Sequence, residues 1–292
     1  GMVLKPDQFA VMKINWQDKA QNLREIAKEL NIGIDSLAFF DDNPVERRWV
    51  SEQLPEVTVI DVPTDPMLYA DTLRRCPVFE RLSLSAEDRV RGRMYAENRL
   101  RTELMTQASS MDAFYHSLSM EMELTDVTAA NLARVAQLTQ KTNQFNLTTK
   151  RYSEEQVKEM AASPDWRLCA VRVKDRFGDN GIVGVAFLSI AGGAAEVDTL
   201  LLSCRVIGRT IETAFLSHLA DLARAAGASQ LRGWYLPTKK NPPCKDFYPQ
   251  HQFTVQERTP TGGIHYAFDL KAGKIEWPAW ILKVSGAAVV AS

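Results

Sequence analysis

The chain of 292 residues has almost no excess charge, because its 35 basic residues nearly balance its 36 acidic ones. A protein that binds nucleic acid usually carries a basic patch or stripe, so this balance argues against such a partner. The sequence also has no apolar run long enough to cross a bilayer and no basic-then-apolar signal peptide, and we expect no membrane span. These absences favour an ordinary globular protein.

Cysteine and histidine are scarce, and neither has the spacing of a metal site. The four cysteines, Cys76, Cys169, Cys204 and Cys244, include no CxxC pair, and the four histidines include no HxxH or HExxH. Scattered cysteines of this kind are typical of a reducing compartment, so we expect a cytoplasmic protein.

The N-terminal third predicts alternating helices and strands. A helix over 15–30 precedes a short buried strand over 36–40, and a further helix precedes a strand over 56–62. This order predicts a parallel sheet. A long helix then leads to a change of pattern near residue 110. We therefore expect two domains, 2–110 and 111–292, each large enough to bury a core.

Two adjacent carboxylates, Asp41 and Asp42, follow the strand over 36–40. Carboxylates at the carboxyl end of a strand suit Mg²⁺, and neighbouring carboxylates repel each other unless a cation lies near. The alternative role is to cap the next helix, and Asn43 fits that role better. The sequence thus predicts a metal at Asp41 and Asp42.

The segment NWQDKAQNLREIAKELNIGIDSLAFFDDNPVERRWV resembles the later part of a haloacid-dehalogenase-type phosphatase domain of the FkbH-like kind. The resemblance implies that Asp41 and Asp42 help to hold Mg²⁺ and that Lys19 contacts a phosphoryl group. The nucleophile motif of that family, Asp-x-Asp-x-Thr, does not occur in the sequence, so we expect weak Mg²⁺ binding or none. Either the sequence is a piece of a longer protein, or the gene has lost this half-site. The first strand would then have an open edge, which a second copy of the chain is one candidate to cover.

The segment EVDTLLLSCRVIGRTIETAFLSHL, residues 196–219, predicts a buried strand, a turn and a helix. The N–H groups and positive dipole at a helix start suit phosphate, and the same field stabilises a thiolate. The turn carries the predicted phosphate ligands Arg205, Gly208, Arg209 and Thr210 beside a reactive Cys204. In the alternative interpretation the arginines pair with carboxylates such as Glu196 or Asp198, and Cys204 is a small hydrophobic residue at a strand end.

Residues 118–270 predict a strand, two helices, three antiparallel strands with the turn after the third, and then helix, strand, helix and a hairpin. This order resembles a GNAT acyltransferase domain, and Arg205–Thr210 matches the coenzyme-A-binding motif of that family except for its final threonine. The resemblance implies a GNAT-like α+β domain with a mixed, largely antiparallel sheet. It also implies that the turn opens where two parallel strands diverge. The fold class expected for the whole chain is α/β, with a partial Rossmann-like segment before this domain.

The polar stretch over 142–149 contains Asn143 and Gln144, which are either parts of a capped loop or contacts to a substrate. Asn241, before the predicted helix at 246–250, is a third predicted substrate contact. The segments TNQFNLTTKRY, DRFGDNGIVGVA, DTLLLSCRVIGR and PTKKNPPCKDFY, together with the phosphatase-like segment, resemble an FkbH-like protein along essentially the whole chain.

The resemblance implies a role in polyketide biosynthesis. A three-carbon acyl group from a phosphoglycerate would rest on Cys204 as a thioester and pass to the phosphopantetheine arm of an acyl carrier protein, with Lys19 acting on the phosphorylated donor. Two alternatives remain open. The chain is a non-catalytic docking or scaffold protein for the carrier, or it is a GNAT N-acetyltransferase that uses acetyl-coenzyme A.

Overall fold

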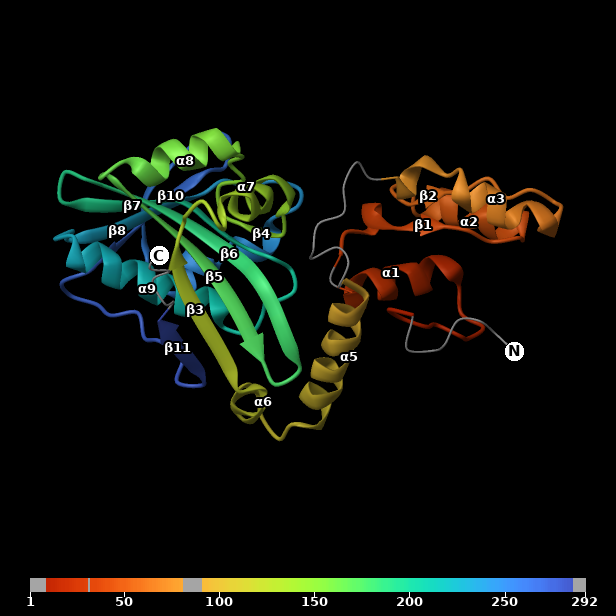
Figure 1. Cartoon of the computed structure of the whole chain (residues 1–292), viewed down its shortest axis with the longest axis horizontal. Helices are drawn as coiled ribbons and strands as arrows, with labels where there is room; N and C mark the ends of the chain where they lie inside the picture. The colour runs from red at the N-terminus through yellow and green to blue at the C-terminus, as the bar shows by residue number, and fades with distance from the viewer. Residues whose placement is uncertain (1–8, 31, 81–90, 286–292) are drawn as a thin grey trace. The chain divides into compact units, whose positions relative to one another are not determined.

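The computed structural model describes residues 9–30, 32–80 and 91–285 (Figure 1). The chain divides into two compact units, Gly1–Arg99 and Leu100–Ser292, and the division falls within helix α5 (Arg91–Gln107). The expected boundary at residue 110 lies C-terminal to this division. No helix among the described residues is both long enough and apolar enough to cross a membrane.

The first unit is built on a small parallel β-α-β arrangement. Its elements before α5 are α1 (Lys19–Leu30), η2 (Ile34–Ser36), β1 (Ala38–Phe39), α2 (Pro44–Gln53), β2 (Thr58–Val59), η3 (Pro66–Leu68), α3 (Tyr69–Arg74) and η4 (Pro77–Phe79). Strands β1 and β2 pair in parallel, as the sequence predicts, but each has only two residues. The core between α1, α2 and β2 is correspondingly small, with Ala20, Leu23, Val50, Leu54 and Val57 as its buried members.

Side chains at the helix starts determine where α1 and α2 begin. The carboxylate of Asp18 accepts the N–H of Gln21 at 2.8 Å, so α1 begins later than residue 15. The side chain of Asn43 accepts the N–H of Val45 at 3.0 Å, and Pro44 occupies the first turn of α2. The predicted capping role of Asn43 is confirmed.

The second unit is a nine-stranded sheet with helices on both faces. After α5 its elements are α6 (Met111–Leu118), β3 (Met120–Asp126), α7 (Leu132–Lys141), β4 (Phe145–Asn146), α8 (Glu154–Ala162), β5 (Trp166–Asp175), β6 (Gly178–Ala191), β7 (Ala194–Leu202), α9 (Ile211–Ala225), β8 (Gln230–Tyr235), η5 (Pro242–Cys244), α10 (Phe247–Gln250), β9 (Thr254–Arg258), β10 (Ile264–Asp269) and β11 (Ile281–Ser285). The strand order is β11-β3-β5-β6-β7-β8-β10-β9, and β4 adds to β7.

Only the β11–β3 and β7–β8 pairs of this sheet are parallel, and the other pairs are antiparallel. The expected mixed, largely antiparallel sheet is therefore confirmed, and so is the predicted order of elements from β3 to β10. The elements that were not predicted include α6 before β3, the short strand β4 between α7 and α8, and the edge strand β11.

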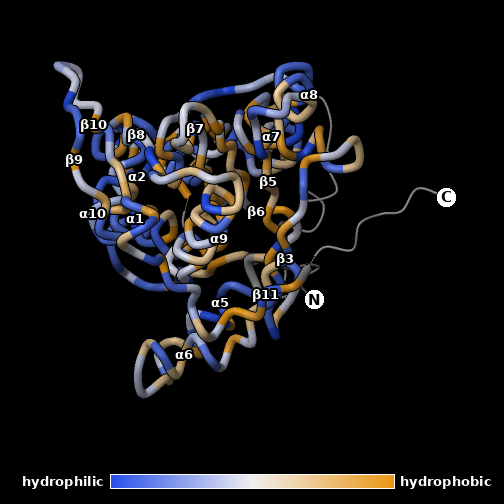
Figure 2. The backbone as a smooth tube through the Cα atoms, turned by 90° about the vertical axis from the view of Figure 1, so that its left-hand side faces the viewer, coloured by the Kyte–Doolittle hydropathy of each residue, from blue (hydrophilic) through white to orange (hydrophobic). Residues whose placement is uncertain are grey.

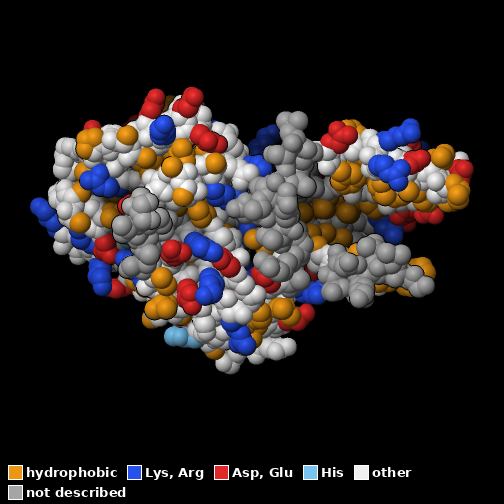
Figure 3. Space-filling model, viewed as in Figure 1, with side chains coloured by type: hydrophobic (Ala, Val, Ile, Leu, Met, Phe, Trp, Pro, Cys, Tyr) orange, Lys and Arg blue, Asp and Glu red, His pale blue; other side chains and the backbone are white. Residues whose placement is uncertain are grey.

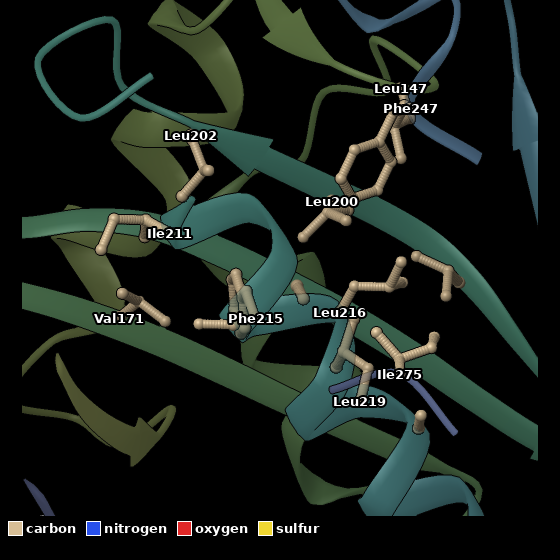
Figure 4. Close-up of a cluster of buried hydrophobic side chains, with 14 of the residues drawn as sticks. Leu147, Val171, Leu200, Leu202, Ile211, Phe215, Leu216, Leu219, Phe247 and Ile275 are labelled. Atoms are coloured by element: carbon tan, nitrogen blue, oxygen red, sulfur yellow. The ribbon is translucent and has the colours of Figure 1, made fainter. Parts of the chain in front are cut away.

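Alternating side chains of the strands form two separate cores. Leu200 and Leu202 of β7 contact α9 on one face, where Figure 4 shows Ile211 and Phe215 directed toward the strands. Leu201 faces the other way and belongs to a smaller core beneath α7 and α8. Figure 2 shows hydrophobic segments along these strands. Because side chains alternate along a strand with a period of two residues, one strand contributes hydrophobic side chains to the cores on both faces of the sheet.

A β-bulge in β7 marks the point where β7 and β8 diverge. On β6, Phe187 pairs with Thr199 and Leu188 with Val197, so Asp198 has no partner there. The parallel pairing of β7 with β8 ends at the same place, since its last pair joins Val197 to Gly233. An extra residue bends a strand and increases its twist, which separates β7 from its parallel neighbour.

Candidate functional site

The turn after β7 holds five of the predicted site residues. It extends over 203–210 and leads directly into α9. Within it Gly208 and Thr210 have φ values of 78° and 60°. Glycine takes this left-handed conformation without cost, but a threonine is strained there and needs contacts that hold it. The turn therefore has a defined shape that neighbouring side chains must maintain.

Two aromatic side chains supply those contacts. The indole N–H of Trp280 donates to the Thr210 hydroxyl at 2.8 Å, and that hydroxyl donates to the carbonyl of Arg209 at 2.6 Å. The hydroxyl of Tyr115 donates to the carbonyl of Gly208 at 3.3 Å, and its ring stacks on Trp280. The threonine that replaces the expected small residue thus ties the turn to the segment before β11. Its predicted contact with phosphate remains a prediction.

Cys204 is the half-buried first residue of the turn proper and belongs to no disulfide. Cys169 and Cys244 are buried, and burial raises the pKa of each thiol to about 12. The Cys244 thiol also donates to the carbonyl of Gln144 at 3.2 Å. Cys169 and Cys244 are therefore protonated structural residues, while Cys204 and Cys76 retain access to solvent.

Asp198 is engaged by its own partners, although the sequence places it close to Cys204. Its carboxylate accepts the hydroxyl of Tyr152 at 2.5 Å and that of Thr199 at 3.1 Å, and it forms an ion pair with Lys150. Burial and the Asp198 carboxylate raise the pKa of the Tyr152 phenol. A carboxylate neutralised in this way has less influence on a nearby thiol.

Arg209 belongs to a buried cluster of charges. Arg101 donates two hydrogen bonds to Asp175, at 2.7 and 2.8 Å, and Arg209 donates a third at 3.2 Å. Burial and the Arg101 charge lower the pKa of Arg209 to about 10. The predicted ion pair of a turn arginine exists, but its carboxylate is Asp175. Glu196 pairs instead with His265, at 3.0 Å. The guanidinium of Arg209 is thus committed to the interior.

Arg205 and Gly208 are the predicted phosphate ligands nearest the surface. Arg205 is half-buried and donates to the carbonyl of Asn180 at 3.3 Å. The backbone N–H groups of Gly208 and Glu212 lie near the Glu212 carboxylate and act to lower its pKa. Burial raises the pKa of this carboxyl group. Some of the N–H groups expected to meet a phosphate therefore already lie near a carboxylate of the same chain.

The gap between β7 and β8 is filled by the chain itself. Residues 145–148, which we call the filling strand, are all buried. Leu147 donates its N–H to the carbonyl of Leu200 at 3.2 Å and accepts the N–H of Leu236, just after β8, at 2.8 Å. Phe145 and Asn146 pair with the last residues of β7. The two parallel strands diverge, as the resemblance implies, but the space between them is occupied by residues 145–148, because the bulged strand finds new backbone partners in this segment.

The three predicted substrate contacts flank the filling strand. The carboxamide of Asn143 accepts a hydrogen bond from Arg151. Gln144 contributes the backbone carbonyl that receives the Cys244 thiol. Asn241 is fully buried, and its amide group donates to the carbonyls of Asn146 and Leu236 at 2.9 and 3.0 Å. The structure gives each of them a local structural partner, and their contact with a substrate remains a prediction.

The first unit brings Lys19 and Asp41 together at the carboxyl end of β1. Their ammonium and carboxylate groups lie 3.8 Å apart, and the Asp41 carboxylate also accepts the N–H of Asn43 at 2.9 Å. Asp42 is exposed. Within the described part of the chain no group of three or more His, Cys, Asp or Glu side chains could hold a metal. These residues therefore do not fit a tight Mg²⁺ site, and no chemical step is assigned to the metal.

His251 and Tyr248 have contacts that no local sequence pattern predicts. The Nδ1–H of His251 donates to the carbonyl of Phe247 at 2.7 Å, and Nε2 accepts the hydroxyl of Thr213 at 2.9 Å, which places the ring against the first turn of α9. The fully buried Tyr248 hydroxyl has no hydrogen-bond partner among the described residues. A Cβ atom at Gly233 would lie 2.0 Å from it, so the glycine inside β8 was the available signal.

Comparison with known proteins gives structural likenesses and no family. No family model and no curated protein matches the chain. Among solved structures, the ribosomal-protein-S18-alanine N-acetyltransferase of Escherichia coli is 13% identical with a TM-score of 0.40, over 51% of this chain and 94% of that one. The GNAT domain of the S. lividans protein PAT is 17% identical with a TM-score of 0.40, over 50% and 89%.

A third solved structure is similar to a shorter stretch. It is the N-terminal part of a Bacteroides fragilis protein that contains a phosphatase domain and was solved with Mg, and the identity is 49% with a TM-score of 0.27. The match covers 28% of this chain and 22% of that chain. All three TM-scores lie below 0.5, so none of these likenesses assigns an activity.

Proposed function

We propose that this chain is an FkbH-like acyltransferase that carries a three-carbon acyl group on Cys204 and passes it to the phosphopantetheine thiol of an acyl carrier protein. The observation that carries the proposal is the position of Cys204. It lies half-buried in a shaped turn at the end of β7, beside Arg205 and ahead of α9, whereas the other two cysteines of the second unit are buried and protonated.

The proposed chemistry balances without a redox step. The Cys204 thiolate attacks the carbonyl carbon of an acyl phosphate, a C–S bond forms, and the C–O bond breaks as phosphate departs with the electron pair. The thiol of the carrier arm then attacks the thioester, and its proton passes to the released Cys204 sulfur. Arg205 is the turn cation that would attract the phosphate of the donor.

The first unit would bind or orient the phosphorylated donor and would not hydrolyse it. The partly exposed ammonium group of Lys19 supports a contact with phosphate, but no aspartyl nucleophile of the expected motif is present in the sequence. We propose that this polypeptide releases no phosphate from acyl phosphates by phosphatase chemistry, and that Mg²⁺ binds weakly or not at all.

A docking or scaffold role is the second candidate, and one observation favours it. The first unit exposes large hydrophobic side chains, Ile14 at 90% and Met67 at 86% among them, and in the described residues β1 has β2 as its single strand partner. Such surfaces are typical of binding to another chain, either the carrier or a second copy. The filled gap beside β7 argues against the acetyl-coenzyme A alternative.

The experiment that tests the proposal is acylation followed by peptide mapping. The protein is incubated with a glyceryl acyl phosphate, and the peptides of all four cysteines are analysed by mass. We expect the acyl mass on the Cys204 peptide, transfer of that mass to a pantetheinylated carrier, and loss of both in Cys204→Ser but not in Cys76→Ser. Equal acylation of Cys76 and Cys204, or transfer by Cys204→Ser, would remove the thioester role. Docking without acylation would favour the scaffold.

A further inference from the structure

The filling strand is held on both sides and has the character of a permanent part of the sheet. Asn241 clamps it through the carbonyl of Asn146 at 2.9 Å, while the oxygen of the same carboxamide accepts the N–H of Thr238 at 2.7 Å. Asn146 itself donates to the carbonyl of Thr142 and accepts the N–H of Thr149. A buried carboxamide with all its groups bonded fixes a unique local arrangement.

Its side chains belong to the main core. Figure 4 shows Leu147 and Phe247 beside Leu200 of β7, and the rings of Phe145 and Phe247 meet edge to face at 5.2 Å. Phe145 is 4% exposed and Leu147 is fully buried. Displacement of the strand would bring both side chains to water and break the backbone bonds to Leu200 and Leu236.

This arrangement matters because the edge of β7 is what an extended amide-containing ligand needs. An extended peptide binds an open strand edge through main-chain hydrogen bonds, and the amides of the pantetheine part of coenzyme A can pair with such an edge in the same way. Beyond the bulge at Asp198 the edge of β7 has no such opening, since Phe145, Asn146 and Leu147 already occupy it.

We propose that the filling strand determines which thiol ligands this domain accepts. By occupying the edge of β7 it prevents any ligand, coenzyme A included, from binding with its pantetheine part extended between β7 and β8. Cys204 then remains accessible to acyl donors and thiols whose reactive end alone enters the turn. The exclusion stands on the hydrogen bonds of the filling strand, and only the statement about Cys204 rests on the proposed function.

The test compares coenzyme A binding in the full chain and in variants that loosen the filling strand. Leu147→Ala removes its core contact and Asn241→Ala removes its clamp, while Val157→Ala truncates a buried side chain in the other core, beneath α8. Hydrogen exchange of the peptide containing 145–148 verifies the loosening. We expect no saturable binding by the unaltered chain up to about 1 mM, a gain of at least about tenfold in the loosened variants, and none in Val157→Ala.

Two results would overturn the proposal. One is coenzyme A binding to the unaltered chain together with faster exchange of residues 145–148. The other is a loosened variant, with faster exchange demonstrated, that binds coenzyme A no better than Val157→Ala. If Leu147→Ala does not fold, Asn241→Ala and the unaltered chain still decide. Acylation of Cys204 in the same samples reports the proposed function separately, because it needs no ligand between β7 and β8.

Discussion

The two units of this chain differ in how completely they bury their large hydrophobic side chains. In the second unit, helices lie on both faces of a nine-stranded sheet, and large side chains such as Phe187 and Phe215 are fully buried. In the first unit, two strands of two residues support a small core, and hydrophobic side chains remain at the surface (Figure 3). A sheet buries side chains only where neighbours cover it, so the second unit has the features of an independent domain and the first those of a binding surface.

The two units also differ in how deeply their charged side chains are buried. In the second unit, Asp175 is fully buried between Arg101 and Arg209 and accepts three hydrogen bonds from them. In the first unit, Lys19 and Asp41 lie 3.8 Å apart, and the lysine side chain is nearly half exposed. Water screens the Lys19–Asp41 pair of the first unit but does not reach the Asp175 cluster of the second unit. Removal of one charged partner should therefore have very different consequences for stability in the two units.

The largest expected effect follows removal of the central carboxylate of the buried cluster. Asp175→Asn removes the negative charge that both buried guanidinium groups contact, and we expect the free energy of unfolding to fall by roughly 3–5 kcal/mol. Urea unfolding followed by circular dichroism measures it. The matched variant Asp41→Asn should cost less than about 1 kcal/mol. Comparable losses in both variants would contradict the assigned difference between the two units.

A hydrophobic truncation sharpens the same comparison. Phe215→Ala empties a site in the core beneath α9, and we expect a loss of about 3–5 kcal/mol because the transfer and cavity contributions add. Ile14→Ala in the first unit removes a side chain that is already in water, and its cost should stay within about 0.5 kcal/mol. A large loss for Ile14→Ala in the isolated protein would mean that its side chain is covered in solution, for example by a second copy.

The second unit was predictable from sequence because its strands are long and its turns are marked. The crowding of Val197, Leu200, Leu201 and Leu202 indicated a buried strand, and β7 is found there. The position of α9 followed from Gly208 and the helical spacing after it. The filling strand was not predicted, because two residues carry no period and the polar stretch 142–149 is typical of a loop.

The candidate site was predictable in position but not in pairing. Local spacing placed Cys204 and Arg205 in the turn between a strand and a helix, and they lie there, although α9 begins only at Ile211. The partners of the turn come from distant segments. Asp175 meets Arg209 through the β5–β6 hairpin, and Trp280 reaches Thr210 from the segment before β11. Neither contact has a local signal, so a sequence pattern identifies the charges of a turn but not which of them the fold neutralises.

A third prediction concerns acid sensitivity of the second unit. Burial lowers the pKa of His218 to about 4, with nearby Lys283 acting in the same direction and Asp221 and Asp126 opposing it. Its Nδ1 has no hydrogen-bond partner among the described residues. Between the unfolded pKa near 6.5 and the folded value near 4, the unfolded chain holds a proton that the folded chain does not. Stability should therefore fall as the pH drops through this window, by at most about 3 kcal/mol, and should not depend on this group above it.

The measurement compares urea unfolding between pH 7 and pH 4 in the unaltered chain and in His218→Gln. We expect a shallower pH dependence in the variant, since glutamine does not titrate. Carboxylates that titrate below pH 5 contribute equally to both proteins and cancel in the difference. Parallel curves for the two proteins would show that His218 is protonated alike in the folded and unfolded states.

The smallest expected effect tests what the Lys19–Asp41 pair is. If it is an ordinary surface ion pair, a double-mutant cycle of Lys19→Met and Asp41→Asn should give a coupling of about 0.2–1 kcal/mol. That coupling should shrink as salt is added, because the Debye length falls to about 3 Å at 1 M. Mg²⁺ should then act only through ionic strength, so equal ionic strengths of MgCl₂ and NaCl should give the same melting temperature. A melting temperature raised specifically by Mg²⁺, and no longer raised in Asp41→Asn, would instead show that these carboxylates recruit a metal, with water or another chain supplying the remaining ligands.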